Sequence, residues 1–334
     1  MKGLRGMPGT RPRLAYFVAA LAAAAWFGSA GAQNAVMYPA RNIQIVVPYT
    51  PGTGADILSR LFGPKLAERW KIGVITDNRA GAAGNIGAEF VARAAPDGHT
   101  LLFTATAFST NPAFGQKLSF DPVKSFAPVV LVATGALALV VNPYLPVKSM
   151  REFLSLARRH PGELHYASPG NGGPQHLAME LLKLETGLNL VHVPYKGSAG
   201  AISDVIGGHV QATIAALQTA RPSVRGGKLR MLAVMGPRRS PVFPEVPTLK
   251  ELGHANLEVE TWYGIFAPAG TPAHAIAKLN AEMNALLQHA GIRELLAKHG
   301  MSAAGGGPGR LGDLVKRELA RWSRVVAAAG IRTD

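Results

Sequence analysis

Short apolar runs alternate with helical patterns along most of this chain, and the alternation limits its fold more than any other feature does. Residues 43–47 predict a buried strand, and the apolar positions that follow recur at helical spacing. Residues 74–76 and 101–103 predict two further strands, with a helix over residues 87–95 between them. Such alternation is typical of an α/β fold in which mainly parallel sheets are flanked by helices.

The same alternation begins again in the middle of the chain. Ser149 and Glu152 have the spacing of a capping box, which predicts a helix that ends near His160. Because one α/β unit is followed by a second, we expect two lobes. Around this helix we expect strands at residues 164–167, 190–193, 210–216 and 229–234, with helices at 174–185 and 201–206.

A last predicted strand, at residues 259–266, is followed by two helical patterns. We expect the chain to cross between the lobes near residues 139–142 and again at this strand, so that the tail returns to the first lobe. The predicted division is a first lobe at residues 33–140, a second lobe at 141–260 and a return to the first lobe at 261–334.

The first 32 residues have the three parts of a secretory signal peptide. Basic residues stand at positions 2, 5, 11 and 13, and an apolar run at 14–27 and an Ala-Gly-Ala cleavage motif at 30–32 follow. The run is shorter than the roughly 20 residues of a membrane-spanning helix. We therefore expect residues 1–32 to be removed and the mature protein to reach the periplasm; an uncleaved anchor is the alternative.

Composition excludes several classes of function. The chain has no cysteine, so it has no disulfide, no thiolate metal site and no cysteine nucleophile. Its ten histidines show no metal-ligand spacing, and we expect no metal and no cofactor. The formal net charge is +15, but the basic residues are scattered and form no dense run, so we do not expect nucleic acid as a partner.

The loop after the first strand is the first candidate binding segment. Gly52 and Gly54 permit a ligand to approach the backbone closely. The helix that follows begins with unpaired N–H groups and a partial positive charge, which suit a carboxylate without any cationic side chain. Thr50 and Thr53 add hydroxyl donors. The alternative is an ordinary strand–helix turn in which Asp56 is the N-cap.

A hydroxyl-rich loop after the strand at residues 101–103 is the second candidate. It contains Thr104 and Thr106. A loop at the carboxyl end of a parallel strand faces the ligand crevice of an α/β fold. The alternative is turn chemistry at Asn111-Pro112.

The second α/β unit repeats the design of the first loop. Ser168, Gly170, Asn171 and Gly172 precede a helix and are small or polar. A hydrolase would place its serine in Gly-x-Ser-x-Gly, which this loop lacks. His176 is the one base that such an enzyme would find nearby, and we expect it to be an ordinary structural histidine.

Tyr195 follows the next predicted strand and offers an apolar face with a hydroxyl. Beside it, Lys196 either attracts an anion or pairs with Asp204, and the sequence leaves both roles open. The role of Gln218 is open as well.

These segments together resemble the Bug family of extracytoplasmic solute receptors, the binding components of tripartite tricarboxylate transporters. The resemblance runs from about Tyr38 to the C-terminus and depends on the order and spacing of several short motifs. They are Tyr38-Pro39, residues 47–56 (VPYTPGTGAD), 77–81 (DNRAG), 96–100 (PDGHT), 166–168 (YAS), 193–197 (VPYKG), Gly207-Gly208 and 245–248 (EVPT).

The resemblance implies a two-lobed Venus-flytrap fold that closes on a ligand. It also implies that two facing strand–helix loops, Tyr49 to Asp56 and Ser168 to Gly172, hold a carboxylate through backbone amides, hydroxyls and water. Thr104, Thr106 and Tyr195 would line the crevice. Thr53 separates two glycines where the family often has Pro-Gly-Gly, which puts the identity of the ligand in doubt.

We therefore expect a monomeric periplasmic receptor that captures a small carboxylate solute, delivers it to inner-membrane permease subunits and catalyses nothing. A secreted hydrolase that uses Ser168 and His176 is one alternative. A ligand-sensing subunit of a signalling system is another, and it would share this fold.

Overall fold

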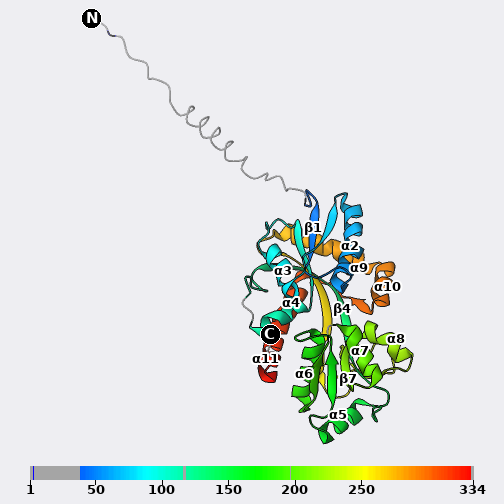
Figure 1. Cartoon of the computed structure of the whole chain (residues 1–334). Coiled ribbons are helices and arrows are strands. Elements are labelled where there is room, and N and C mark those ends of the chain that lie inside the picture. The colour runs from blue at the N-terminus through cyan, green and yellow to red at the C-terminus, as the bar shows by residue number, and fades with distance from the viewer. Residues whose placement is uncertain (1–2, 4–37, 116–117, 196, 332–334) are drawn as a thin grey trace. The chain divides into compact units, whose positions relative to one another are not determined.

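The computed structural model describes Gly3 and residues 38–115, 118–195 and 197–331. The predicted signal peptide, except for Gly3, and Lys196 lie outside the described residues. The chain divides into two units, Met1–Ala40 and Arg41–Asp334, and every element below belongs to the second unit (Figure 1). None of the described helices combines the length and the apolar character that crossing a membrane requires.

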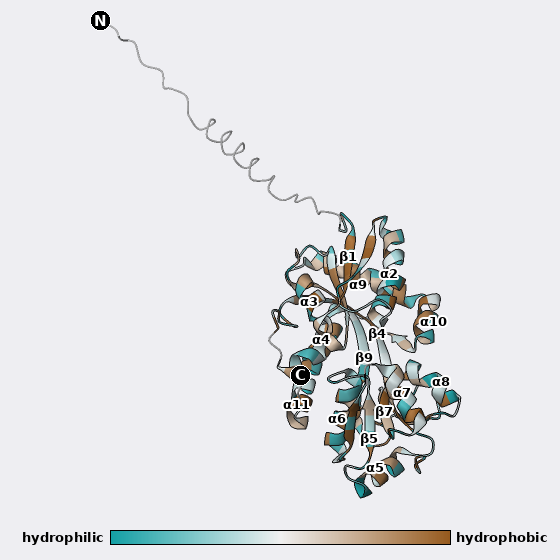
Figure 2. Ribbon diagram, in the orientation of Figure 1, coloured by the Kyte–Doolittle hydropathy of each residue, from teal (hydrophilic) through white to brown (hydrophobic). Residues whose placement is uncertain are grey.

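The first sheet is built on a buried apolar strand, β1, whose residue Ile45 pairs with Thr76 on one side and with Leu101 on the other. β1 is apolar except for Gln44 (Figure 2), as expected of a strand covered on both faces. In spatial order the strands are β2 (Val74–Asn78), β1 (Ile43–Val47), β3 (Thr100–Ala105), β9 (Glu260–Pro268), β4 (Phe126–Val141) and β10 (Met301–Ala303).

The second sheet repeats this plan around β5. Its strands in spatial order are β6 (Val191–Pro194), β5 (His165–Ser168), β7 (Ala212–Ala216), β4 and β8 (Arg230–Val234). In each sheet most strands run in one direction, and the strands that cross between the lobes provide the antiparallel pairings. The expected two-lobed α/β architecture is therefore confirmed.

The long strand β4 belongs to both sheets. Residues 126–136 pair with β9, and residues 137–141 pair with β7 and β8. The sequence predicted only a crossing near residues 139–142 and not the earlier part of this strand, which contains Pro128 and two register shifts. Gly135 is required at the crossing, since a Cβ there would lie 2.7 Å from the Thr261 hydroxyl oxygen on β9.

Helices cover both sheets. The predicted N-cap is confirmed, because the Glu152 N–H donates to the Ser149 Oγ over 3.2 Å at the start of α5 (Met150–Arg159), while the Glu152 carboxylate accepts the N–H of Lys148 and not that of Ser149. The helix α5 belongs to the second lobe, together with α6 (Pro174–Thr186), α7 (Ser198–Gly207) and α8 (Leu217–Arg225). The helices of the first lobe are α2 (Gly54–Trp70), α3 (Asn85–Ala92), α4 (Ala107–Thr110), α9 (Ala273–Gln288) and α10 (Ala290–Lys298).

The last helix, α11 (Pro308–Ala329), packs against the cores of both lobes. Leu311 and Val315 join the core of the first lobe, together with residues of β1, β3 and β9. About two to three turns after Val315, Trp322, Val325 and Val326 join the core of the second lobe. The helix therefore ties the two lobes together in addition to the two crossing strands.

We predict that Trp322→Ala destabilises the protein by about 3–5 kcal/mol, because it removes a fully buried indole from the core of the second lobe. Ser323→Ala, at the exposed neighbouring position, should change the free energy of unfolding by less than about 0.5 kcal/mol. Urea denaturation of both variants measures the difference. Equal stability of the two variants would show that α11 is not anchored in this core.

Candidate functional site

The loop between β1 and α2 is held from behind by a buried carboxylate. Asp56 is 3% exposed, and it accepts hydrogen bonds from the Gly52 N–H at 2.9 Å, from Asn78 at 2.9 Å and from Arg60 at 3.0 Å. The alternative that Asp56 is the N-cap is wrong, because α2 starts at Gly54 and Thr53 takes the N-cap position without a side-chain cap. Asp56 therefore shapes the loop.

The environment of Asp56 keeps it ionised. Burial acts to raise the pKa of this carboxyl, but the hydrogen bonds from Gly52, Asn78 and Arg60 outweigh burial and bring the pKa below its usual value. The charge is thus satisfied within the protein. The loop needs no cation from a ligand to balance it.

The start of α2 presents unpaired backbone donors. The first intrahelical acceptor of this helix is the Thr53 carbonyl, which the Ile57 N–H contacts at 2.9 Å. The N–H groups of Gly54, Ala55 and Asp56 have no acceptor among the described residues. These donors and the partial positive charge of the helix end form a place where an anionic oxygen is stabilised.

Two tyrosines belong to this region, and one of them, Tyr263, lies against the helix start. The Tyr49 hydroxyl contacts the Thr104 Oγ1 at 3.0 Å and accepts from the Ala105 N–H at 3.3 Å. Tyr263, on β9, lies so close to Gly54 that a Cβ on that glycine would be 2.4 Å from its hydroxyl oxygen. Burial raises the pKa of both phenols, so both keep their protons.

Thr104 and Thr106 lie below the surface that these tyrosines form. Thr104 is 1% exposed and contacts Tyr49, while Thr106 is 2% exposed and its Oγ1 accepts the Trp262 N–H at 2.8 Å. Thr106 thereby joins the loop after β3 to the crossing strand β9. Both threonines position their neighbours, and neither side chain is open to solvent.

The matching loop in the second lobe, between β5 and α6, is organised by Ser168. Its side chain is buried, and its Oγ lies 2.6 Å from the His192 Nε2. The same hydroxyl lies 3.0 Å from the Gly170 carbonyl oxygen. The one hydroxyl hydrogen is therefore used inside the protein, by Gly170 or by His192.

His176 holds the far end of this loop. Its Nδ1 accepts the Gly172 N–H at 3.0 Å, so the ring proton must be on the other nitrogen. The ring stacks on His192 with centroids 3.8 Å apart, and Tyr166 stacks on His192 at 4.8 Å. The three stacked rings therefore support the loop through the hydrogen bonds of His176 and His192.

Burial keeps both histidines neutral. It lowers the pKa of His176 to about 4, with a smaller contribution from the Lys183 ammonium. It also lowers the pKa of His192 to about 4, with the neighbouring His176 as the next cause. Beyond them, the Tyr166 hydroxyl donates to Glu180 at 2.5 Å, and Lys183 pairs with Glu180 at 2.7 Å.

Tyr195 forms the rim of the second loop. Its N–H donates to the Ser168 carbonyl at 2.9 Å, and its hydroxyl donates to Asp204 at 2.5 Å. Partial burial and then the Asp204 carboxylate raise the pKa of this phenol to about 12. Asp204 thus has a partner in Tyr195, while the predicted roles of Lys196 fall outside the described residues.

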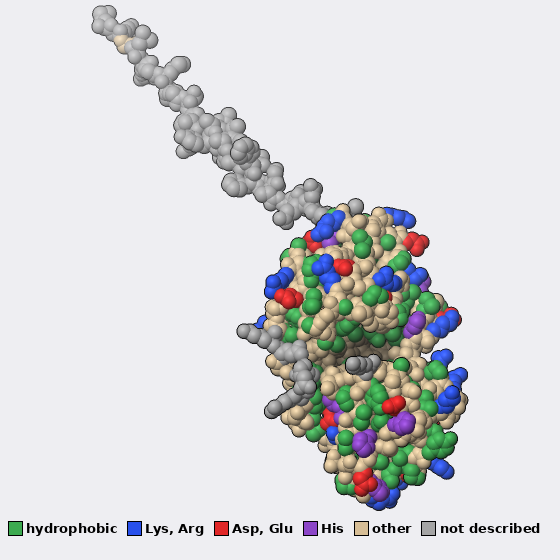
Figure 3. Space-filling view, in the orientation of Figure 1, with side chains coloured by type: hydrophobic (Ala, Val, Ile, Leu, Met, Phe, Trp, Pro, Cys, Tyr) green, Lys and Arg blue, Asp and Glu red, His purple; other side chains and the backbone are tan. Residues whose placement is uncertain are grey.

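The two loops belong to facing parts of the two lobes. Phe114, in a short helix of the first lobe (η2, Asn111–Phe114), would lie 2.8 Å from a Cβ on Gly172. Figure 3 shows the surface hollowed between the lobes. The residues open to solvent in these loops include Thr50, Gly52 and Asn171, with Tyr49, Thr53, Gly54, Gly170 and Tyr195 half-buried.

The sequence analysis missed two residues of this site. Tyr263 lies on a crossing strand, and its importance depends on the pairing of β9 with β3, which puts it opposite Ala105. His192 sits between two valines, and a histidine in an apolar strand was the signal that could have identified it. The base near Ser168 is therefore His192, whereas the hydrolase alternative had named His176.

This geometry also argues against the hydrolase alternative. Ser168 is buried, and its hydroxyl lies between the His192 Nε2 at 2.6 Å and the Gly170 carbonyl at 3.0 Å. A nucleophilic serine needs an exposed Oγ that donates to its base. The Ser168–His192 contact is therefore structural.

A two-lobed α/β fold with strand–helix loops at the carboxyl ends of β1 and β5 is the architecture of periplasmic binding proteins. Residues 59–331 match the sequence family described as tripartite tricarboxylate transporter family receptor. The chain is 34% identical to the protein BugT of Bordetella pertussis, over 91% of this chain and 94% of BugT. It belongs to this Bug-type receptor family.

Solved structures agree with this assignment. Rpa4515 from R. palustris, solved with adipate, is 35% identical with a TM-score of 0.75, over 88% of this chain and 99% of that one. MatC from Rhodopseudomonas palustris, solved with bound malate, is 32% identical with a TM-score of 0.71, over 86% and 100% of the two chains. The receptors of this family are periplasmic solute-binding proteins and not enzymes.

We predict that the stacked histidines make the protein less stable in mild acid. Their pKa is about 6.5 in the unfolded chain and about 4 in the folded protein. The unfolded chain therefore binds more protons between these values, so stability is full above about pH 6.5 and falls as the pH is lowered toward 4.

The double variant His176→Asn, His192→Gln keeps an acceptor for Gly172 and a donor for Ser168 but cannot titrate. Its melting temperature should fall several degrees less than that of the unmodified protein between pH 6.5 and pH 4. Melting curves across this range measure the two slopes. Parallel slopes would mean that the histidines do not link folding to protons.

Proposed function

We propose that this protein captures a small carboxylate in the crevice between its lobes. The observation that carries the proposal is the start of α2, where unpaired N–H groups lie beside two protonated tyrosines. Preorganised neutral donors of this kind bind a carboxylate without a cationic side chain. The adipate and malate in two related structures support the same class of solute.

The solute's carboxylate would accept hydrogen bonds from the Gly54 and Ala55 amides and from the Tyr263 hydroxyl. Tyr49, Thr50, Gly52 and Thr53 would complete the first-lobe side, and Gly170, Asn171, Gly172 and Tyr195 would close over the rest. Asp56, Thr104, Thr106 and Ser168 would act by holding these loops in place. Their burial and internal hydrogen bonds support that division of roles.

Capture would proceed by closure of the lobes. Residues 33–140 and 261–334 would form one lobe and residues 141–260 the other, joined where β4 and β9 cross and by α11, whose C-terminal half packs in the core of the second lobe. A solute that touches both loops binds the closed state more tightly than the open one, and this difference in affinity sets how far it shifts the equilibrium toward closure. The shared strand β4 supports this hinge.

Export and delivery complete the proposal. Residues 1–32 would direct the chain to the periplasm and be removed. The closed, monomeric receptor would then dock on permease subunits in the inner membrane, as the family's place in a tripartite transporter suggests. Uptake of the solute by a reconstituted permease, with and without this receptor, would test the last step.

A panel of carboxylates and neutral analogues should identify the solute class. A ligand that binds only the folded state raises the melting temperature, by an amount that grows with its concentration over Kd. We expect residues 33–334 to be stabilised by one or a few acids such as adipate or malate, and not by neutral diols of the same length. Stabilisation by neutral compounds alone would overturn the carboxylate assignment.

Gly54→Ala should weaken binding of that acid at least about tenfold, because the added Cβ must displace the Tyr263 hydroxyl from the helix start. Gly309→Ala is the matched control, since Gly309 lies in the first turn of α11 with nothing within 4 Å of a Cβ. Isothermal titration calorimetry on both variants gives the Kd values. Equal affinities would place the solute elsewhere.

A further inference from the structure

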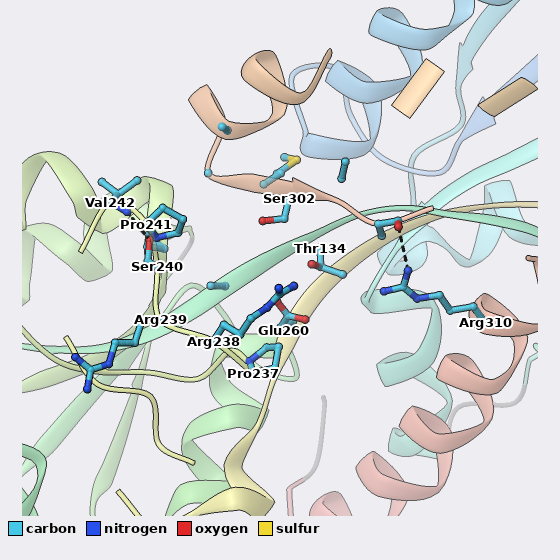
Figure 4. A pocket seen from close by; sticks show the side chains of 17 residues that line it. Thr134, Pro237, Arg238, Arg239, Ser240, Pro241, Val242, Glu260, Ser302 and Arg310 are labelled. Atoms are coloured by element: carbon cyan, nitrogen blue, oxygen red, sulfur yellow. Dashed lines mark hydrogen bonds between the residues drawn. The ribbon is translucent and has the colours of Figure 1, made fainter. Parts of the chain in front are cut away.

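A second cavity, of about 490 Å³, lies beside the crossing strands (Figure 4). Thr134 and Ala136 of β4 and Glu260 of β9 line one wall. The second lobe contributes residues 237–242, and the first lobe contributes residues 300–304 with Ala297 and Arg310. It shares no described residue with the crevice loops. Its volume is within the range of small-molecule sites.

The cavity carries more positive than negative charge. Arg238, Arg239 and Arg310 line it, with Glu260 as its acid. Arg239 is already paired with Glu251 at 2.8 Å. Arg238, in contrast, has no acceptor among the described residues, and Figure 4 shows its side chain directed into the cavity beside Glu260.

Arg310 is held in place by hydrogen bonds from only one of its guanidinium nitrogens. Its Nη1 donates to the carbonyls of Ala304 and Gly305 at 2.9 and 3.0 Å. A guanidinium has five N–H donors, so others stay available at the cavity. The two hydrogen bonds fix its position, which lowers the entropy lost when it binds an anion.

Glu260 is close enough to Arg238 and Arg310 to feel their charge, but it forms no ion pair with either. Burial raises the pKa of its carboxyl, against the lowering effect of a hydrogen bond from Thr134 and of Arg238 and Arg310. Within the described part of the chain, neither arginine forms an ion pair with it within 4 Å. The two guanidinium groups therefore line the cavity without a carboxylate of the described residues at ion-pair distance from Arg238 or Arg310.

The cavity also borders a contact between the lobes. Gly300, in the first lobe, packs on Gln218 of α8, and a Cβ at Gly300 would lie 2.4 Å from the Gln218 Cβ. Arg310 is on the first-lobe helix start, while Arg238 follows β8 in the second lobe. A molecule that contacts both arginines thus contacts both lobes beside their hinge.

We propose that this hinge cavity is a second ligand site, which binds a small multivalent oxyanion, a phosphate or a polycarboxylate, between Arg238 and Arg310. Guanidinium groups bind such anions through paired, charge-assisted hydrogen bonds. An anion held by both lobes must also bias the angle between them, since its hydrogen bonds depend on that angle. The inference does not depend on what the crevice binds.

Calorimetric titration of residues 33–334 with inorganic phosphate and, separately, with citrate at constant ionic strength tests the proposal. We expect saturable binding of at least one anion, weakened about tenfold or more by Arg238→Gln and by Arg310→Gln. Gly54→Ala leaves the crevice impaired and should keep this binding. A response to phosphate alone, or to citrate alone, assigns the source of the oxyanion.

Arg159→Gln, which removes an exposed charge at the end of α5, is the matched control and should change the Kd less than twofold. Arg310 also holds two carbonyls, so Arg238→Gln, at an exposed position without such hydrogen bonds, separates lost binding from altered folding. Absence of saturable binding up to about 10 mM of either anion would overturn the proposal, as would an equal loss in Arg159→Gln.

Discussion

The fold depends, for its binding function, on buried side chains that hold two strand–helix loops open at the starts of their helices. Backbone N–H groups can receive an anion only if no other group of the protein occupies them. In the first lobe Asp56 bonds the Gly52 N–H from behind and leaves the start of α2 free. In the second lobe Ser168, His192 and His176 hold the corresponding loop with neutral groups.

The connection between the lobes depends on strand pairing and helix packing, whereas the loops depend on side-chain hydrogen bonds. Two strands, β4 and β9, carry the chain between the lobes, and β4 pairs within both sheets, so the hinge is continuous with both cores. The helix α11 adds a third tie, because its two ends are buried in different cores. The proposed closure would therefore bend well-packed elements by small amounts, and the charged cavity lies beside two of these elements, β4 and β9.

The sequence predicted what depends on local pattern. The apolar run at β1, the N-cap at Ser149 and the glycine-rich loops follow from spacing alone. Features that depend on distant pairing could not be predicted in the same way. Tyr263 reaches Gly54 only because β9 pairs with β3, and Ser168 meets His192 only because β5 pairs with β6. A hydroxyl in a loop also does not reveal whether it faces the ligand or, as Thr106 does, a neighbouring strand.

The most direct measurement is a titration of the ¹⁵N-labelled protein, residues 33–334, with the acid that stabilises it most, followed by amide NMR shifts. If both helix starts hold the carboxylate, the amides of Gly54 and Ala55 in the first lobe and of Asn171 in the second should shift and saturate together. Saturable shifts elsewhere, with these amides unmoved, would contradict capture at the helix starts.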